Sequence, residues 1–254
     1  RLGPVGSTAL RLASRIVSIL RAGVPLDSLG AFAQASAVLI SVPEYWLEQF
    51  QEKLLRCEFS WKGKCVLLCD SKLDSGALGG LADAGAAVGS ITPVPLFDEK
   101  VAVVEGSRKA VQEARKLMTS PGLRVLTMDA GRKALFSAGT GFATSLVLPL
   151  LAASVETLRA SGLEQNDAVA LTEKLFLKTL RSYLKSGRKG WEGPLPAQDT
   201  ESVRSQVQAL FRESPSLAAY YYENALKVSE ILKQDPAWIR EVASDVYPQA
   251  ASAI

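Results

Sequence analysis

The sequence predicts an α/β chain whose first half carries a mostly parallel β-sheet and whose second half is all α-helix. Three observations support this prediction. Short runs rich in Val, Ile and Leu alternate with helical segments as far as residue 127. The earlier runs show little polar alternation, as is typical of strands covered on both faces. After about residue 130 these runs stop, and apolar residues recur at helical spacing instead.

The strand-like runs of the first half are separated by segments with a helical pattern. Strands that are joined through helices run parallel, with right-handed crossovers. We expect strands at 16–20, 37–42, 65–69, 86–91, 101–106 and 123–127, and helices at 4–14, 45–56, 75–84 and 107–118.

The second half opens with apolar residues at helical spacing over 130–162, and Gly162 suits a helix C-cap. A break rich in Gly and Pro follows at 186–199. We expect further helices at about 164–186, 199–213, 215–233 and 236–244. The natural boundary separates one domain at 1–129 from a second at 130–254.

Composition indicates a soluble globular protein, because 48% of residues are hydrophobic and 22% are charged, with both signs interspersed. The net charge of +3 is too small to favour nucleic acid, and the cations of 181–189 suit a helix end, where the helix dipole favours positive charge. The longest apolar stretch, 142–155, contains Pro149 and is short for a membrane span. We therefore expect a buried helix there, and neither a nucleic-acid nor a membrane partner.

Three cysteines, Cys57, Cys65 and Cys69, have no signal peptide before them. This sparse, odd set fits reduced thiols in the cytoplasm better than a disulfide framework. Cys65 and Cys69 lie four residues apart in a strand-like run, on one face, so we expect core thiols. The chain has no histidine, which excludes His-based triads and His metal ligands, and we expect no metal site.

The first residues resemble a strand-to-helix turn that binds phosphate groups. Gly3 and Gly6 can be the second and third glycines of a G-x-G-x-x-G motif, with Leu2, Pro4 and Val5 beside them. The first glycine would fall on Arg1, so a first strand is expected upstream of residue 1. Simple close packing of a helix start explains the same pair of glycines, and both interpretations stay open.

The predicted second strand, 16–20, is followed by Arg21, with no carboxylate before Asp27. In a Rossmann fold, an acidic residue there binds the ribose hydroxyls, whereas a basic one binds the 2′-phosphate of NADP. Arg21 therefore favours NADP over NAD, although a solvated cation at a strand end explains it as well. Val42 and Pro43 end the next strand, at the edge where open α/β sheets bind ligands.

Longer stretches resemble a known family. They are "AVLISVP", "WKGKCVLLCDSKLDSGALGGLADAGAAVGSITPVPLF", "KALFSAGTGFATSLVLPLLAASVETL" and "GPLPAQDTESV". In order and content they resemble a bacterial family of Rossmann-like proteins with a helical second domain of unknown function, of the DUF2520 type. That family is similar to pyrroline-5-carboxylate reductase and to the 6-phosphogluconate and β-hydroxyacid dehydrogenases. The resemblance implies a 6-phosphogluconate-dehydrogenase-like helical domain, NADP-dependent oxidoreductase activity and a homodimer formed through that domain.

The chain departs from the family pattern at its polar positions. Thr92 stands where relatives usually have the histidine of Ser-Leu-His-Pro. Phe136 and Ser137 replace a Tyr-His pair, and Ser145 replaces an asparagine. In the later Gly-Pro segment, Asp199 remains, but Ala197 and Gln198 replace an arginine and a glycine. These departures put turnover in doubt, though not the fold.

Lys133, near the start of the long helix, is the best remaining proton donor for hydride transfer, with Ser137 one turn later on the same face. Related hydroxyacid dehydrogenases present a lysine on this helix. A first-turn lysine that faces water is the plain alternative. Lys72, Thr92 and Asp199 could bind a polar substrate, although each also suits an ordinary loop or helix position.

Two functions follow from these observations. The first is an NADP-dependent reductase or dehydrogenase of a small polar metabolite, with Lys133 and Ser137 as catalytic residues. The second is a catalytically silent protein on the same fold that binds a dinucleotide or only a partner. The absence of histidine favours the second function, and the two-domain plan favours the first.

Overall fold

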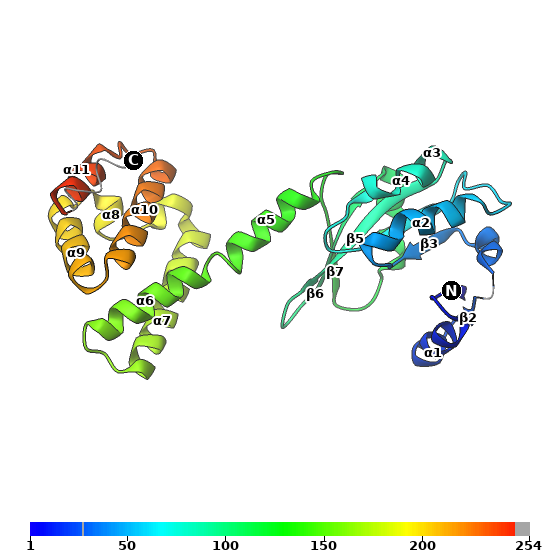
Figure 1. Ribbon diagram of the computed structural model, residues 1–254, viewed down its shortest axis with the longest axis horizontal. Helices are drawn as coiled ribbons and strands as arrows, with labels where there is room; N and C mark the ends of the chain where they lie inside the picture. The colour runs from blue at the N-terminus through cyan, green and yellow to red at the C-terminus, as the bar shows by residue number, and fades with distance from the viewer. Residues whose placement is uncertain (27, 247–254) are drawn as a thin grey trace. The chain divides into compact units, whose positions relative to one another are not determined.

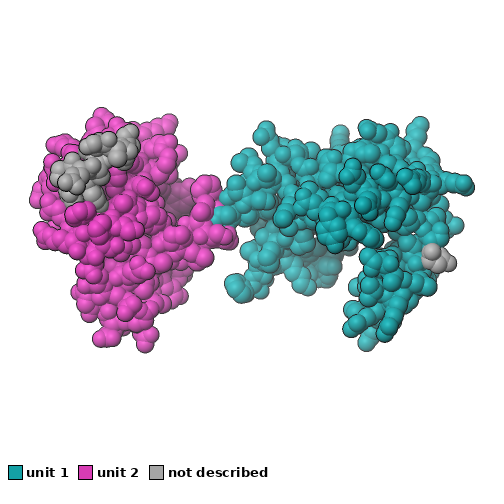
Figure 2. Space-filling view, in the orientation of Figure 1, with its two compact units in different colours: residues 1–141 teal, residues 142–254 magenta. Residues whose placement is uncertain are grey.

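The computed structural model describes residues 1–26 and 28–246 and divides into two compact units, Arg1–Gly141 and Phe142–Ile254 (Figure 2). The division cuts helix α5 (Lys133–Ala143) close to its end. The first unit carries the sheet and the second is helical, as the sequence predicts. The assignment of 1–129 to a cofactor and of 130–254 to substrate and dimerisation stays a prediction.

The first unit is built on one five-stranded sheet with the strand order β3-β4-β5-β6-β7 (Figure 1). Every neighbouring pair is parallel except β5 and β6, which form an antiparallel hairpin. The prediction of a mostly parallel sheet is therefore confirmed. The strands are β3 (Ala37–Ile40), β4 (Cys65–Cys69), β5 (Ala87–Pro95), β6 (Lys100–Gly106) and β7 (Leu123–Thr127).

Both faces of the sheet are covered at its central strand β4, which explains why that strand lacks polar alternation, whereas the edge strands β3 and β7 keep exposed residues. On β4, Val66 and Leu68 pack into one core with α2 (Glu44–Leu55), α3 (Gly79–Asp83) and the 3-10 segments η1 (Leu29–Gln34) and η2 (Ser75–Leu78). On the opposite face, Cys65 and Leu67 pack against Ala110 and Ala114 of α4 (Arg108–Leu117). Cys65 is fully buried, and that burial raises the pKa of its thiol to about 11, as befits a core thiol.

The structure corrects the sequence analysis at residues 16–20. These residues form the second half of helix α1 (Leu10–Leu20) rather than a strand. A short apolar run cannot be assigned by periodicity alone, and this run continues the helical spacing that begins at Leu10 and Ala13. Helix α1 lies between two short strands, β1 (Pro4–Val5) and β2 (Val24–Pro25), which pair in parallel as a separate two-stranded sheet.

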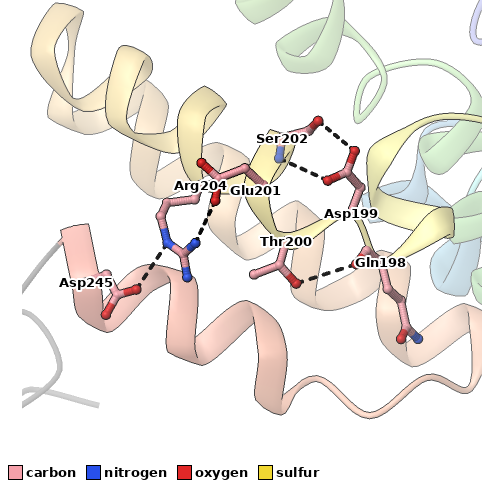
Figure 3. A network of polar contacts seen from close by, with 7 residues as sticks. All are labelled: Gln198, Asp199, Thr200, Glu201, Ser202, Arg204 and Asp245. Carbon is pink, nitrogen blue, oxygen red and sulfur yellow. Dashed lines mark hydrogen bonds and ion pairs between the residues drawn. The ribbon is translucent and has the colours of Figure 1, made fainter.

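The second unit consists of helices. Val203 and Val207 of α9 (Thr200–Glu213) pack against Val242 of α11 (Ala237–Val246) to form its core. Arg204 links the same two helices, because its guanidinium lies 3.2 Å from Asp245 and 3.1 Å from Glu201 (Figure 3). The helices are α6 (Leu148–Ala160), α7 (Gln165–Ser186), α8 (Pro194–Ala197), α9 (Thr200–Glu213), α10 (Pro215–Leu232) and α11 (Ala237–Val246), with the 3-10 turn η3 (Gly187–Gly190) before α8.

The predicted buried helix at 142–155 is the second correction. A turn at 144–147 separates α5 from α6, because Pro149 has no N–H with which to continue the hydrogen bonds of a preceding helix. By length and composition alone, the stretch Lys133–Ala160 could cross a membrane, and no residue of its most apolar window is fully buried. The run is therefore apolar but at most half-buried, and among the described residues α7 is the helix that packs extensively against α6.

A close backbone contact fixes the β5–β6 hairpin to the start of α4. Gly106 has a φ of +125°, and a Cβ built there would lie 2.5 Å from both Gly89 Cα and Val88 O. A Cβ on Gly89 would in turn meet Ala110 of α4 at 2.9 Å. Only glycine satisfies both the backbone angle and the spacing at Gly106.

We expect Gly106→Ala to lower the free energy of unfolding by about 3 kcal/mol, because strain at positive φ adds to a backbone clash. Gly139→Ala is the matched control. It lies within α5 with nothing within 4 Å of the added Cβ, so alanine should stabilise by roughly 0.5–1 kcal/mol. Thermal unfolding followed by circular dichroism tests both, and equal effects of the two substitutions would contradict the explanation.

Candidate active site

The ammonium group of Lys133 is buried among oxygen atoms at the sheet. Its side chain is 0% exposed, and Nζ donates to the carbonyls of Asp70 at 2.8 Å and Leu73 at 2.6 Å. Nζ also donates to Ser90 Oγ at 2.9 Å. Since an ammonium has three hydrogens, all of them are used within the protein.

A second buried charge, the carboxylate of Glu105, completes this network. Glu105 is 0% exposed and accepts hydrogen bonds from Ser75 N at 2.7 Å, Ser75 Oγ at 2.8 Å and Ser90 Oγ at 2.6 Å. The Ser90 hydroxyl therefore accepts from Lys133 and donates to Glu105. These contacts hold the first residue of α5 to β5, β6, η2 and the loop after β4.

The burial of Lys133 contradicts the plain alternative of a lysine that faces water. Burial lowers the pKa of Lys133, and the nearby Glu105, Asp70 and Asp74 partly oppose that shift. A depressed pKa brings an amine closer to the range in which it exchanges a proton readily. Ser137, one turn further along α5, is exposed.

Four predicted site residues lie around the ends of β3 and β4 and the middle of β5. Thr92 is buried and donates to the Asp70 carbonyl at 3.2 Å, the oxygen that also accepts from Lys133. Lys72 is exposed, with Nζ 4.0 Å from Glu44, the first residue of α2. Pro43 is the N-cap of that helix and follows the half-buried Val42. The ends of β3 and β4 lie side by side because the two strands are parallel neighbours, and Thr92 follows the last residue of β5 that pairs with β4.

The glycine segment is organised differently from the prediction. Gly3 precedes β1, and the strand-to-helix turn is formed by Gly6 and the residues that follow it, up to Ala9. A Cβ on Gly6 would lie 2.7 Å from Leu26 Cδ2, whereas a Cβ on Gly3 would have nothing within 4 Å. Gly6 therefore serves close packing, and the backbone beside Gly3 is open. Ala9 caps α1 without a side-chain hydrogen bond, so its first-turn amides have no side-chain acceptor there.

Arg21 does not lie at the tip of a strand, which is a third correction. It is the C-cap of α1, with a φ of 50°, and its side chain is exposed. The predicted position followed from the wrong assignment of 16–20. A cation at a helix C-terminus is favoured by the helix dipole, which gives Arg21 a structural explanation independent of any ligand.

Asp199, the predicted substrate residue of the second half, belongs to the second unit and is the N-cap of α9 (Figure 3). Its carboxylate accepts from Ser202 N at 3.1 Å and from Ser202 Oγ at 2.6 Å. These hydrogen bonds lower the pKa of Asp199. Among residues 1–26 and 28–246, no group of three or more His, Cys, Asp or Glu side chains could hold a metal ion.

Sequence reasoning missed two members of the buried network, Glu105 and Ser75, and assigned no role to Ser90. One signal was available. Glu105 ends the run of apolar residues at 101–104, in a strand expected to be covered on both faces. A carboxylate in such a strand is buried and needs hydrogen-bond donors. Nothing local, however, indicates that those donors come from residues 15 and 30 positions earlier in the chain.

Comparison with known families identifies the chain. The model of a domain of unknown function, DUF2520, matches residues 100–228, from the start of β6 into α10. The protein belongs to the DUF2520 family. Among curated protein sequences, none matches this chain.

Solved structures share the fold of this DUF2520 protein. A candidate NADP oxidoreductase from Bacteroides fragilis has 14% identity and a TM-score of 0.72 over 91% of this chain and 88% of its own. Protein TM1727 from Thermotoga maritima has 15% identity and a TM-score of 0.63 over 91% and 92%. An imine reductase variant from Myxococcus stipitatus, in complex with NAD+, has 15% identity and a TM-score of 0.61 over 95% and 98%. At these identities the likeness establishes the Rossmann-like fold with a helical second part.

We expect Lys133→Met to lower the free energy of unfolding by about 3 kcal/mol, because it leaves Glu105 buried without its cation and takes the lysine donor from the Leu73 carbonyl, whereas the Asp70 carbonyl keeps Thr92. Lys72→Met removes an exposed lysine nearby and should change stability by less than about 0.5 kcal/mol. Urea denaturation measures both, and equal effects would show that the buried network contributes nothing.

The loss should also depend on pH. Burial lowers the pKa of Lys133 below its ordinary value of 10.5, so the unfolded chain binds more protons in the window between the two values. The stability of the native protein relative to Lys133→Met therefore rises as pH increases through that window. A difference that shrinks toward pH 10.5 would contradict the direction of the shift.

Proposed function

We propose that the protein is a nicotinamide dinucleotide-dependent oxidoreductase that uses NADP and acts on a small polar metabolite. The observation that carries the proposal is the two-part fold of this DUF2520 chain. It is shared over 95% of its length with imine reductases from Myxococcus stipitatus in complex with NAD+ and with NADP+. Ligands of open α/β sheets bind at the carboxyl ends of parallel strands, where Val42, Pro43 and Lys72 lie, and Thr92 of β5 donates to Asp70 just after the end of β4.

Two features of the segment from Leu2 to the first turn of α1 would suit the diphosphate of such a cofactor. The backbone beside Gly3 has free space, and the uncapped first turn of α1 offers amide groups to an anion. In this proposal Leu2, Gly3, Pro4, Val5 and Gly6 hold the diphosphate. Arg21 binds the 2′-phosphate, and Val42 and Pro43 line the cofactor at the sheet. Because β1 and β2 form a separate sheet, this ribbon has to approach the end of β3 when the cofactor binds.

When bound, the cofactor would supply the hydride for reduction or accept it for oxidation, and the protein would supply the proton in the first direction and accept it in the second. Lys133 is the proposed proton donor and Ser137 its neighbour on α5. Lys72, Thr92 and Asp199 are the proposed substrate contacts. To donate to a substrate, Lys133 has to release one of its three oxygen partners, and Ser90 is the partner that can rotate its hydroxyl. Ser137 is exposed and needs no such change.

A specific observation favours a second function, a catalytically silent protein that binds the dinucleotide or a partner. All three hydrogens of Lys133 are donated within the protein, and the chain has no imidazole to take its place. In that case the network serves stability, and the fold serves binding.

We also propose that the protein is a cytoplasmic homodimer formed through the helical unit. Helix α6 has no buried residue, and α7 buries only Ala168 and Thr172. A contiguous apolar patch above a few hundred Å² marks an interaction surface, and stable interfaces bury about 800 Å² per partner. The large apolar side chains exposed along this part of the chain are Phe142, Leu146, Leu148, Leu150, Leu163, Val169, Leu171, Leu175, Phe176, Leu177, Leu180, Tyr183 and Leu184.

Cofactor binding tests the first proposal. We expect NADPH to bind with a change in tryptophan fluorescence, and Arg21→Ala to reduce the preference for NADPH over NADH about tenfold, the effect of one lost charge-assisted contact. Arg56→Ala removes an exposed arginine from the C-terminal end of α2 and should leave that preference unchanged.

Turnover of a panel of keto acids and imino acids then separates the two functions, since cofactor binding without turnover supports the silent protein. No binding of NADPH or NADP would overturn both dinucleotide-based versions.

The dimer is tested on one face of α7, where Leu177, Leu180 and Leu184 lie at positions i, i+3 and i+7. We expect the native protein to have twice the chain mass of 27.2 kDa in solution, and Leu180→Lys/Leu184→Lys to be monomeric. Leu117→Lys, at an equally exposed leucine of the first unit, should leave the mass unchanged. Light scattering after size exclusion measures all three, and a native monomer would contradict the proposal.

A further inference from the structure

A groove of about 400 Å³ lies between α4 and the end of β7, at the opposite side of the sheet from β3. Arg108, Gln112 and Arg115 line it from one side of α4, at positions i, i+4 and i+7. Thr127 and Asp129 line it from the end of β7 and the residues that follow. None of these residues belongs to the buried network or to the proposed cofactor site.

The two arginines of the groove have no ionic partner in the part of the chain that the structure describes. Helix α4 has four cations and only one carboxylate, Glu113. Lys116 pairs with Glu113 at 2.7 Å, and Lys109 Nζ donates to the carbonyl of Gly63. Arg108 and Arg115 are left, and both line the groove without a carboxylate in ion-pair contact among the described residues.

The position of Arg108 makes this charge arrangement unfavourable for a helix by itself. Arg108 is the first residue of α4, where the helix dipole is positive and an acidic residue would be stabilising. No acidic residue occupies the first turn. A bound anion would relieve the repulsion that Arg108 experiences there. Arginine is the side chain best suited to phosphate, because its planar group donates two parallel hydrogen bonds.

The groove also has a fixed donor and an acceptor. Arg115 Nη2 donates to Thr127 Oγ1 at 3.2 Å, which directs its guanidinium across the groove toward the end of β7. Gln112 lies between the two arginines, one helical turn from each. Asp129 has no ion pair within the described residues, and its carboxylate can accept hydrogen bonds from ligand hydroxyls.

We propose that this groove binds a phosphorylated small molecule that also carries hydroxyl groups. The phosphate groups lie between Arg108 and Arg115, with Gln112 as an additional donor. The hydroxyl groups donate to Asp129. The volume suits a small metabolite rather than a macromolecule, since such pockets measure about 300–1,000 Å³. The site is separate from the proposed dinucleotide site and does not depend on redox activity.

Inorganic pyrophosphate is the probe that tests the cationic half of the site by isothermal titration calorimetry. We expect saturable binding of one pyrophosphate, and Arg108→Gln/Arg115→Gln to weaken it at least tenfold. The control Arg56→Gln/Arg212→Gln removes the same two charges from exposed positions outside the groove and should weaken binding less than twofold. Citrate, a carboxylate anion of similar charge, should bind more weakly than pyrophosphate.

Asp129→Asn should change the affinity for pyrophosphate in the opposite direction. Pyrophosphate has no hydroxyl to donate, so removal of the nearby negative charge should tighten its binding severalfold. Absence of saturable pyrophosphate binding, or pyrophosphate binding that survives Arg108→Gln/Arg115→Gln, would overturn the proposal.

A titration with NADPH distinguishes the anion-site proposal from the oxidoreductase proposal. If Arg108→Gln/Arg115→Gln loses NADPH together with pyrophosphate, the groove is not a separate site. If NADPH never binds while pyrophosphate does, only the oxidoreductase proposal fails.

Discussion

The burial of two opposite charges, Lys133 and Glu105, around one serine hydroxyl is the constraint on which the first unit depends. A buried ammonium or carboxylate costs several kcal/mol unless every polar atom has a partner. Here each charge has three partners, and Ser90 serves both. Those partners come from the loop after β4, η2 and β5, so the positions of these segments and of α5 are set together. No single one of them can move without exposing a buried charge.

This arrangement changes how the lysine, serine and glutamate of the site are interpreted. Lysine, serine and glutamate near a sheet edge suggest proton transfer, yet in this structure they hydrogen-bond to one another and to backbone. A DUF2520 protein without histidine can thus keep the Rossmann-like fold that it shares with NADP oxidoreductases and imine reductases. Stability and catalysis make opposite demands on Lys133, because a fully satisfied ammonium is a poor donor to a substrate. The balance between them decides which of the two proposed functions holds.

The two units each have an exposed surface, and the residue types on these surfaces differ. Helix α4 packs Ala110 and Ala114 on the sheet and presents Arg108 and Arg115 to a groove, a division that suits a small anion. Helices α6 and α7 instead expose leucine and phenylalanine side chains over much of their length. Such surfaces are stabilised by a protein partner rather than a small molecule. The first surface presents charge, and the second presents apolar area.

The sequence by itself determined the elements whose signals are local. Strands β3 to β7 and helices α2, α4, α7, α9 and α10 lie within a few residues of their predicted bounds, because apolar periodicity and caps act over short distances. The family was also recognisable, since its landmarks are ordered along the chain. The short run 16–20 was misassigned, because five apolar residues suit a strand and a helix turn equally.

Tertiary structure alone decided the environment of the site residues. The burial of Lys133, the role of Glu105 and the separation of β1 and β2 from the main sheet depend on contacts between segments that are 15 to 63 residues apart. Composition cannot indicate those contacts, because the same lysine is stable in water or among three oxygens. Whether Lys133 lies in water or among oxygens is decided by the packing of the sheet and by the position of the start of α5 against it.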